Sequence, residues 1–176
     1  MEKAIFFDRD GTLIEDKIYL NDPNDIVYLP GVFEALTKLK NHGYKFVIMT
    51  NQSGIARGIV DVKNLNQIHK NIGDEFAKHD IEFLDYFYAP YLTSSNHYYR
   101  KPATGMIDEG CEAFNLDPKK SWTVGDRMTD VEAGHRAGAK GILLSQLEDP
   151  KDFDFAPPDA HVDTLDEVAE FIINNS

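Results

Sequence analysis

The sequence predicts an α/β protein with a Rossmann-like, doubly wound parallel sheet and helices on both of its faces. Two observations support this prediction. Short runs of apolar, β-favouring residues recur along the chain, and longer segments with apolar residues at helical spacing separate them. These runs are continuously apolar rather than alternating, which is typical of parallel strands that helices cover on both sides.

The chain opens with an expected strand, a helix and a second strand. Ala4–Asp8 is a short apolar run that suits a buried strand. A helix is expected to begin at Pro30-Gly31, because apolar residues recur after this pair at helical spacing. Gly43 follows the expected end of the helix. Lys45–Thr50 is a second buried run, and it begins the next round of the alternation.

The alternation continues through the middle of the chain. Asp61 is suited to cap a helix that extends to about Lys78. The apolar face of that helix consists of Leu65, Ile68, Ile72 and Phe76. Phe83–Ala89 is the third expected strand and Met106–Phe114 the third expected helix.

The last part of the chain adds two strands and two helices. In chain order these are Trp122–Gly125, Asp130–Ala137, Gly141–Leu144, and a final helix that Asp163 or Thr164 caps and that ends near Ile173. Because parallel sheets bind ligands beyond the carboxyl ends of their strands, the loops of interest begin at Asp8, Thr50, Ala89 and Gly125.

Composition limits the class of protein. The 176 residues suit one domain spanning 1–176, with 42% hydrophobic and 27% charged residues. The formal net charge of −12 argues against a nucleic-acid or anionic-membrane surface. The apolar runs are too short to span a membrane, and no signal peptide is evident at the N-terminus. We therefore expect a soluble, cytoplasmic monomer.

Two acidic residues leave the first strand together, in the segment Asp8-Arg9-Asp10-Gly11-Thr12. Residues two apart on a strand project to the same side, and Gly11 allows a sharp turn. A simple surface turn would give the same pattern. A calcium loop of the EF-hand type would not, because its glycine is the sixth residue and here it is the fourth.

Three further polar segments follow strands or precede helices. Thr50-Asn51-Gln52-Ser53-Gly54 offers a hydroxyl, amides and backbone N–H groups that suit phosphate oxygens. Arg100-Lys101-Pro102 supplies two cations, and Gly125–Asp130 is a second acidic loop. A turn or a solvated charged pair explains any one of them alone. Together they predict phosphoryl transfer, with carboxylates from two loops around a hard divalent cation and Thr50 and Lys101 on phosphoryl oxygens.

The four segments match, in order, the motifs of a known family. DRDGT, TNQSG, RKP and GDRMTD resemble those of the haloacid dehalogenase superfamily of aspartate-nucleophile phosphatases, over nearly the whole chain. The sequence is most similar to the branch that contains heptose-bisphosphate phosphatases and histidinol-phosphatases. Only loops separate the motifs, so we expect this fold without a large cap domain.

The resemblance implies roles for individual residues. Asp8 would be the nucleophile that becomes an aspartyl phosphate, and Asp10 the acid and later the base. Thr50 and Lys101 would stabilise the transferring phosphoryl group. Asp8, the backbone carbonyl of Asp10, and Asp126 would bind Mg²⁺. Asp130 would orient the loop or a metal-bound water.

The resemblance also implies substrate contacts. The expected residues are Asp16, Tyr19, Asn51, Gln52, Ser53, Gly54, Arg57, Arg100 and Arg127. Arg57, Arg100 and Arg127 are candidates for binding a second phosphate. The expected partner is a small phosphorylated substrate.

One segment departs from the family pattern. Many relatives carry a zinc loop rich in cysteine and histidine before the Arg-Lys-Pro motif. Residues 90–99 contain His97 and no cysteine, so we expect no structural zinc. Tyr91, Tyr98 and Tyr99 could pack this loop instead, or stack on a sugar or an imidazole. The other histidines are expected to have no special role.

The sequence thus favours a Mg²⁺-dependent phosphatase acting on a heptose bisphosphate, with histidinol phosphate as the alternative substrate. A phosphosugar-binding module on the same fold is the non-enzymatic alternative. The intact set Asp8, Asp10, Lys101 and Asp126 argues against it, because a binding module needs no nucleophile beside an acid.

Overall fold

The computed structural model describes all 176 residues. Its core is one six-stranded sheet with the strand order β3-β2-β1-β4-β5-β6, in which every pairing is parallel. The strands are β1 (Ala4–Phe7), β2 (Lys45–Asn51), β3 (Tyr86–Ala89), β4 (Trp122–Gly125), β5 (Lys140–Leu144) and β6 (Ala160–Val162). The predicted doubly wound parallel sheet is confirmed.

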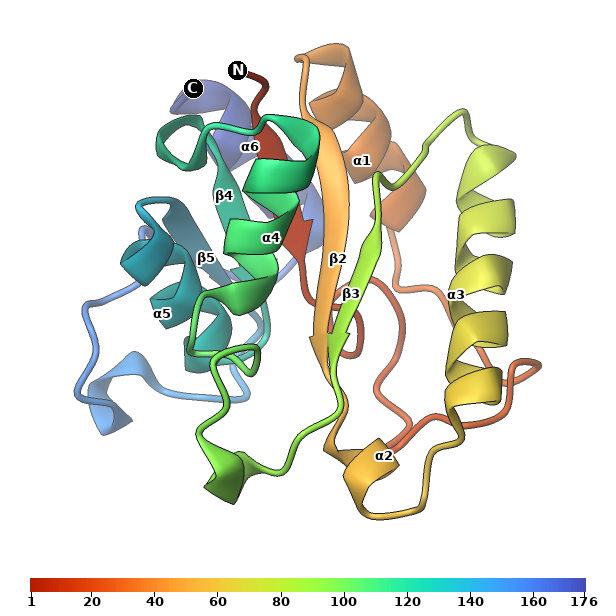
Figure 1. Ribbon diagram of the computed structural model, residues 1–176. Helices are drawn as coiled ribbons and strands as arrows, with labels where there is room; N and C mark the ends of the chain where they lie inside the picture. The colour runs from red at the N-terminus through yellow and green to blue at the C-terminus, as the bar shows by residue number, and fades with distance from the viewer.

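Helices cover both faces of this sheet (Figure 1). They are α1 (Val32–Asn41), α2 (Ser53–Ala56), α3 (Val62–Ala77), α4 (Gly105–Phe114), α5 (Met128–Ala137) and α6 (Leu165–Asn174). Helices α1, α3 and α6 pack on one face, and α4 and α5 pack on the other. No helix combines the length and apolar character that a membrane span requires.

The two faces of the sheet have separate apolar cores, and β1 contributes to both. Ile5 and Phe7 belong to the cluster under α1, α3 and α6, whereas Ala4 and Phe6 belong to the cluster under α4. All four side chains are fully buried. This explains why the strand is continuously apolar in sequence, since neither of its faces meets water.

The strand order places the functional loops. Chain connections run outward from β1 in one direction and from β4 in the other, so the switch point of the sheet lies between these two strands. Phe7 pairs with Val124, and the Asp8 amide donates a hydrogen bond to the Val124 carbonyl at 2.9 Å. The loops that follow β1 and β4 therefore begin side by side.

Some element boundaries differ from the prediction. The third strand begins at Tyr86 rather than Phe83, because Phe83 packs against Phe46 and Phe76 before regular pairing starts. Helix α5 begins at Met128 rather than Asp130. The Met128 amide donates to Glu148 Oε1 at 2.6 Å, a partner that local sequence does not reveal.

Among the strands and α-helices, two short elements were not predicted. β6 has three residues and lies at the edge of the sheet, and α2 is a single turn. Neither has the periodic apolar pattern on which the sequence prediction depends. The predicted caps of α3 and α6 are confirmed, because Asp61 accepts a hydrogen bond from the Lys63 amide and Thr164 from the Glu167 amide.

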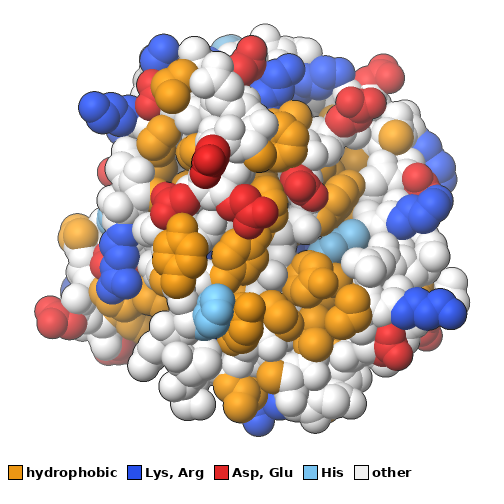
Figure 2. Space-filling view, in the orientation of Figure 1, with side chains coloured by type: hydrophobic (Ala, Val, Ile, Leu, Met, Phe, Trp, Pro, Cys, Tyr) orange, Lys and Arg blue, Asp and Glu red, His pale blue; other side chains and the backbone are white.

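The surface in the orientation of Figure 1 carries acidic side chains over α4 (Figure 2). On this helix Asp108, Glu109 and Glu112 are exposed. They account for part of the net negative charge.

Candidate active site

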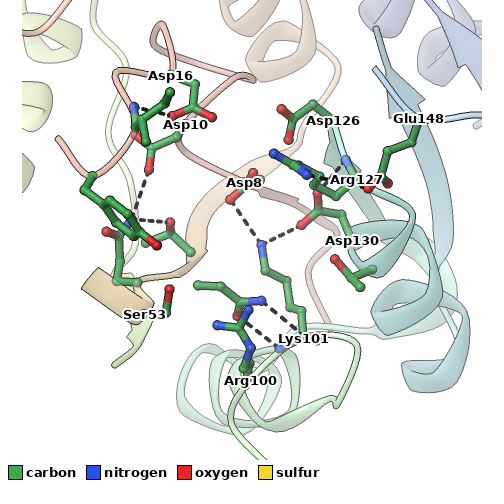
Figure 3. A pocket seen from close by; sticks show the side chains of 16 residues that line it. Asp8, Asp10, Asp16, Ser53, Arg100, Lys101, Asp126, Arg127, Asp130 and Glu148 are labelled. Atoms are coloured by element: carbon green, nitrogen blue, oxygen red, sulfur yellow. Dashed lines mark hydrogen bonds and ion pairs between the residues drawn. The ribbon is translucent and has the colours of Figure 1, made fainter. Parts of the chain in front are cut away.

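The side chain of Lys101 is buried at the carboxyl edge of the sheet, where the residue is 4% exposed. Its Nζ donates hydrogen bonds to Asp8 Oδ1 at 3.1 Å and Asp130 Oδ1 at 2.5 Å (Figure 3). It also donates to the Met49 carbonyl at 2.8 Å. An ammonium group has three donors. These three bonds use all of them, so the charge is fixed in one position.

The backbone of Lys101 is held as well. Asn51 Nδ2 donates to the Lys101 carbonyl at 3.2 Å, and the Lys101 amide donates to Asn51 Oδ1 at 3.1 Å. Asn51 ends β2, so this pair fixes the Arg-Lys-Pro segment to the sheet. Asn51, one of the expected substrate contacts, also lines the pocket. Its amide has in addition this positioning role, which the sequence did not reveal.

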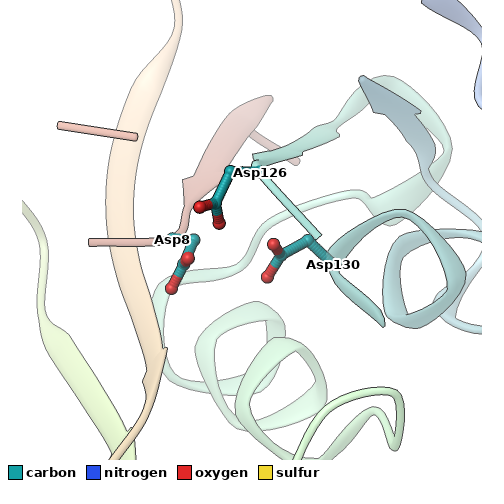
Figure 4. Close-up of side chains that lie close together, drawn as sticks. All are labelled: Asp8, Asp126 and Asp130. Carbon is teal, nitrogen blue, oxygen red and sulfur yellow. The ribbon is translucent and has the colours of Figure 1, made fainter. Parts of the chain in front are cut away.

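Three carboxylates converge beside this ammonium group. Asp8, Asp126 and Asp130 each present an oxygen, and these oxygens lie within 4.8 Å of one another (Figure 4). Burial raises the pKa of Asp8 to about 7, against the opposing charge of Lys101. Burial and the charge of Asp8 also raise the pKa of Asp126 to about 7. Burial lowers the pKa of Lys101, but the charges of Asp130 and Asp8 outweigh this and bring it to about 12.

The donor set fits a hard divalent cation, because all its donors are oxygens and Mg²⁺ prefers oxygen ligands. Both oxygens of Asp130 already accept hydrogen bonds, one from Lys101 Nζ and one from the Arg127 amide at 3.1 Å. Asp8 and Asp126 are therefore the carboxylates better placed to bind the cation. Asp130 orients the lysine and the start of α5.

Gly11 allows the two acidic loops to approach each other. Its φ is +77°, and a Cβ at this position would lie 2.2 Å from Asp126 Oδ2. Any other residue would both strain the backbone and push the carboxylate away.

Asp10 is held differently from Asp8. Its Oδ1 accepts from Arg9 Nε at 3.1 Å, and its Oδ2 accepts from Arg9 Nη2 and Gln52 Nε2, each at 3.0 Å. Gln52 Nε2 also donates to Thr50 Oγ1 at 2.8 Å. Asp10, Gln52 and Thr50 thus form one connected group on the wall of the pocket.

The pocket has a volume of about 460 Å³ and contains most of the predicted site. Its lining includes Asp8, Asp10, Asp16, Tyr19, Thr50, Asn51, Gln52, Ser53, Arg100, Lys101, Asp126, Arg127 and Asp130. Ile18, Thr129 and Glu148 also line it. Ile18 lies in the loop between Asp16 and Tyr19 and Thr129 in the acidic loop Gly125–Asp130, so only Glu148 lies outside the segments that the sequence singled out. Glu148 follows β5 and gives no local sequence signal, although it pairs with Arg127 Nη1 at 3.6 Å.

Gly54 and Arg57 were predicted to contact substrate, but the structure leaves both outside the pocket lining. Gly54 instead makes room for Tyr19, since a Cβ on Gly54 would lie 2.7 Å from the Tyr19 ring. Arg57 is exposed. Burial lowers the pKa of Arg100, and the like charge of Arg57 lowers it further.

The loop of residues 90–99 is held by aromatic and arginine contacts. Tyr91 and His97 stack with ring centroids 3.6 Å apart and an interplanar angle of 11°. Arg100 Nη1 donates to the Tyr91 carbonyl at 3.1 Å, and its Nη2 donates to Thr93 Oγ1 at 3.0 Å. His97 is exposed, and Tyr91 packs the loop.

Comparison with known proteins agrees with this geometry. Residues 3–159 match the model of the polynucleotide kinase 3 phosphatase family. The sheet order and the buried acidic site with its lysine define a phosphatase of the haloacid dehalogenase type. The chain belongs to the polynucleotide kinase 3 phosphatase family, which is of this type.

Individual relatives are more specific. The chain is 35% identical over 156 residues to D-glycero-β-D-manno-heptose-1,7-bisphosphate 7-phosphatase of Haemophilus influenzae, with 85% of each chain covered. It is 36% identical over 153 residues to D-glycero-α-D-manno-heptose-1,7-bisphosphate 7-phosphatase of Campylobacter jejuni, with 87% of each chain covered.

Two further similarities concern another enzyme and a solved structure. Histidine biosynthesis bifunctional protein HisB of Blochmanniella floridana is 33% identical over 149 residues, which cover 83% of this chain but 42% of that protein. The crystal structure of D,D-heptose 1,7-bisphosphate phosphatase from B. bronchiseptica, complexed with magnesium and phosphate, has a TM-score of 0.88, 27% identity and 99% coverage of both chains.

The acidic cluster predicts a pH-dependent response to Mg²⁺. The raised pKa values of Asp8 and Asp126 mean that the folded, metal-free protein loses stability as the pH rises from 3.8 to about 7. Mg²⁺ binds the ionised carboxylates, so it should raise Tm more at about pH 8 than at about pH 5.5. Thermal unfolding with and without Mg²⁺ measures this, and Asp126→Asn should remove most of the shift. An equal shift at both pH values would contradict the assignment.

The contacts within the loop of residues 90–99 predict that it needs no metal. Elemental analysis of the purified protein should find no stoichiometric zinc, because stacking and the Arg100 hydrogen bonds hold the loop. One tightly bound zinc per chain would contradict this prediction.

Proposed function

We propose that this protein is a Mg²⁺-dependent phosphatase that hydrolyses a small sugar phosphate through an aspartyl phosphate on Asp8. The observation that carries the proposal is the buried contact of Lys101 with Asp8 and Asp130, next to Asp126. A nucleophilic carboxylate, a fixed cation for phosphoryl oxygens and a separately held acid are what phosphoryl transfer requires.

In the first step an Asp8 oxygen attacks phosphorus, and the bond from phosphorus to the ester oxygen breaks. Asp10, in its protonated form, gives its proton to the leaving alkoxide. In the second step water attacks the same phosphorus and Asp10 takes its proton, which frees Asp8 and releases phosphate. Lys101 and Thr50 line the pocket. The positive charge of Lys101, fixed by its three hydrogen bonds, and the Thr50 hydroxyl can stabilise phosphoryl oxygens there. Mg²⁺, when bound by Asp8 and Asp126, offsets further negative charge on the phosphoryl group.

For the substrate we propose a heptose 1,7-bisphosphate. The relatives that support this choice act on bisphosphates of both anomers, so the anomer is left to experiment. The lining supports it too, because Arg100 and Arg127 add two guanidinium groups to the pocket besides Lys101. Guanidinium groups are suited to bind phosphate through paired hydrogen bonds. A polynucleotide suits the chain less well, since the net charge is −12. The similarity to HisB keeps histidinol phosphate as the alternative.

The covalent step gives the first test of this function. Asp8→Asn should fold but lose nearly all turnover of p-nitrophenyl phosphate, because an amide is not a competent nucleophile here. Asp10→Asn should lose about 100-fold or more on alkyl phosphates and less on p-nitrophenyl phosphate, whose leaving group needs little protonation.

Steady-state kinetics with Mg²⁺ checks both variants. Wild-type activity in Asp8→Asn would contradict the mechanism. Absence of turnover in the wild type would favour the phosphosugar-binding module, and preference for histidinol phosphate would overturn the heptose assignment alone.

The rim arginines give a second test, on substrate choice. Arg127→Ala should lower kcat/KM for heptose 1,7-bisphosphate by about 10- to 100-fold, the value of one charge-assisted contact, and change it little for p-nitrophenyl phosphate. Arg100→Ala should behave similarly with some loss on both substrates, because it also holds the loop of residues 90–99. Arg57→Ala should have a smaller effect, since Arg57 lies outside the lining.

Arg136→Ala is a matched control. Arg136 is an exposed arginine of α5, the helix that begins directly after Arg127, and it pairs with Glu132. It should leave both substrates unaffected. Equal losses on the two substrates in Arg127→Ala would mean that this arginine acts on the reacting phosphate or on folding rather than on a second phosphate.

A further inference from the structure

A buried arginine lies directly behind the proposed acid. Arg9 is fully buried, although it sits between the two pocket-facing residues Asp8 and Asp10 in sequence. Its guanidinium group makes hydrogen bonds along two of its edges. Nε and Nη2 form a paired contact with the Asp10 carboxylate, and Nη1 lies 3.1 Å from Nε2 of His69.

The chemistry of this second contact fixes the state of His69. An arginine offers only donors, so Nε2 of His69 must accept the hydrogen bond. His69 is therefore neutral, with its proton on Nδ1. Burial and the charge of Arg9 favour the same state, because they lower the pKa of His69 to about 3. Because His69 is neutral, no second positive charge lies beside Arg9. Asp10 is the charged partner of the guanidinium group.

His69 is itself held firmly. It lies on α3, where it is 5% exposed, and its ring stacks on Tyr86 of β3 with centroids 5.3 Å apart and an angle of 19°. A series of side-chain contacts leads from Tyr86 to His69, from His69 to Arg9 and from Arg9 to Asp10. His69 of α3 thus contacts the side chain that donates to both oxygens of Asp10, and Tyr86 of β3 supports His69 from behind.

We infer that Arg9 and His69 are positioning residues that orient the Asp10 carboxyl group for proton transfer to the leaving group. The inference rests on the proposed phosphatase function. The step affected is the first one: the bond from phosphorus to the leaving oxygen breaks, the bond to Asp8 forms, and the proton passes from Asp10 to the leaving oxygen. Misplacing a reacting group by about 1 Å can cost about 100-fold in rate.

A positioning role and a purely structural role differ in how the loss depends on the leaving group. Disorienting Asp10 should slow esters with basic leaving groups and spare those with good ones, because only the former need the proton. General loosening of the fold should slow all esters alike. The parameter to compare is kcat/KM, since it reports only on steps up to formation of the aspartyl phosphate and excludes the later base role of Asp10.

The test uses the full chain with Mg²⁺ and a series of substituted phenyl phosphates from p-nitrophenyl to unsubstituted phenyl. His69→Phe keeps the ring and its packing on Tyr86 but removes the acceptor for Arg9. It should lower kcat/KM about tenfold or more for phenyl phosphate and less than about threefold for p-nitrophenyl phosphate. His69→Gln, which supplies an amide oxygen as acceptor, should restore the shallow dependence of the wild type.

Ile72→Ala is the matched control, because Ile72 is a buried residue of the same helix that lies in the apolar core. It should lower Tm through a cavity and leave the leaving-group dependence unchanged. If His69→Phe does not fold, Arg9→Gln carries the same readout, since it removes the paired contact with Asp10 directly.

Three outcomes would overturn the inference: equal losses on all esters in the folded variant, no loss on phenyl phosphate, or the same steepening in Ile72→Ala. A wild-type protein that hydrolyses none of these esters with Mg²⁺ would overturn the proposed function, and this inference with it. Turnover by the wild type with unaltered dependence in the variants would overturn the positioning role alone.

Discussion

The ammonium group of Lys101 joins parts of the chain that are far apart in sequence, since its hydrogen bonds link Asp8 after β1, Met49 in β2 and Asp130 in α5. Placing these charges in the interior is unfavourable unless they are paired and hydrogen-bonded, and removing one partner of a buried pair typically costs about 3–5 kcal/mol. One lysine faces three carboxylates here, counting Asp126. Burial, reinforced by the neighbouring carboxylates, raises the pKa of Asp8 and Asp126 to about 7. The excess of carboxylates over cations makes the site suitable for a divalent cation.

The sheet supplies the positions from which this pairing is built. The strand order brings the ends of β1 and β4 together, and Gly11 lets their loops approach without a clash with Asp126. Asn51 at the end of β2 then fixes the backbone of Lys101 from the other side. The carboxylates thus arise from the switch point, and the lysine is brought to them by side-chain hydrogen bonds rather than by a strand.

Sequence reasoning could predict Asp8, Lys101 and Asp126, because each lies in a polar segment at a strand end or helix entrance and the alternation of strands and helices fixes where such segments meet. It could not predict the role of Glu148, which caps α5 and pairs with Arg127 from a loop after β5. The contact of Arg9 with His69 joins residues 60 positions apart, and neither residue lies in a pattern that indicates the other. Contacts of this kind depend on tertiary packing and have no local period or motif.

The central claim is that Asp8, held by Lys101, forms a covalent bond to phosphorus during turnover. It is tested most directly by acid-quenching the wild-type protein during hydrolysis of a phosphate ester with Mg²⁺ and locating bound phosphate by peptide mass spectrometry. We expect phosphate on the Asp8 carboxylate, in the peptide that contains the first acidic loop. Phosphate on another residue would contradict this mechanism. So would finding no phosphate on the protein during turnover, provided that the same quench traps the intermediate of a known aspartate-nucleophile phosphatase.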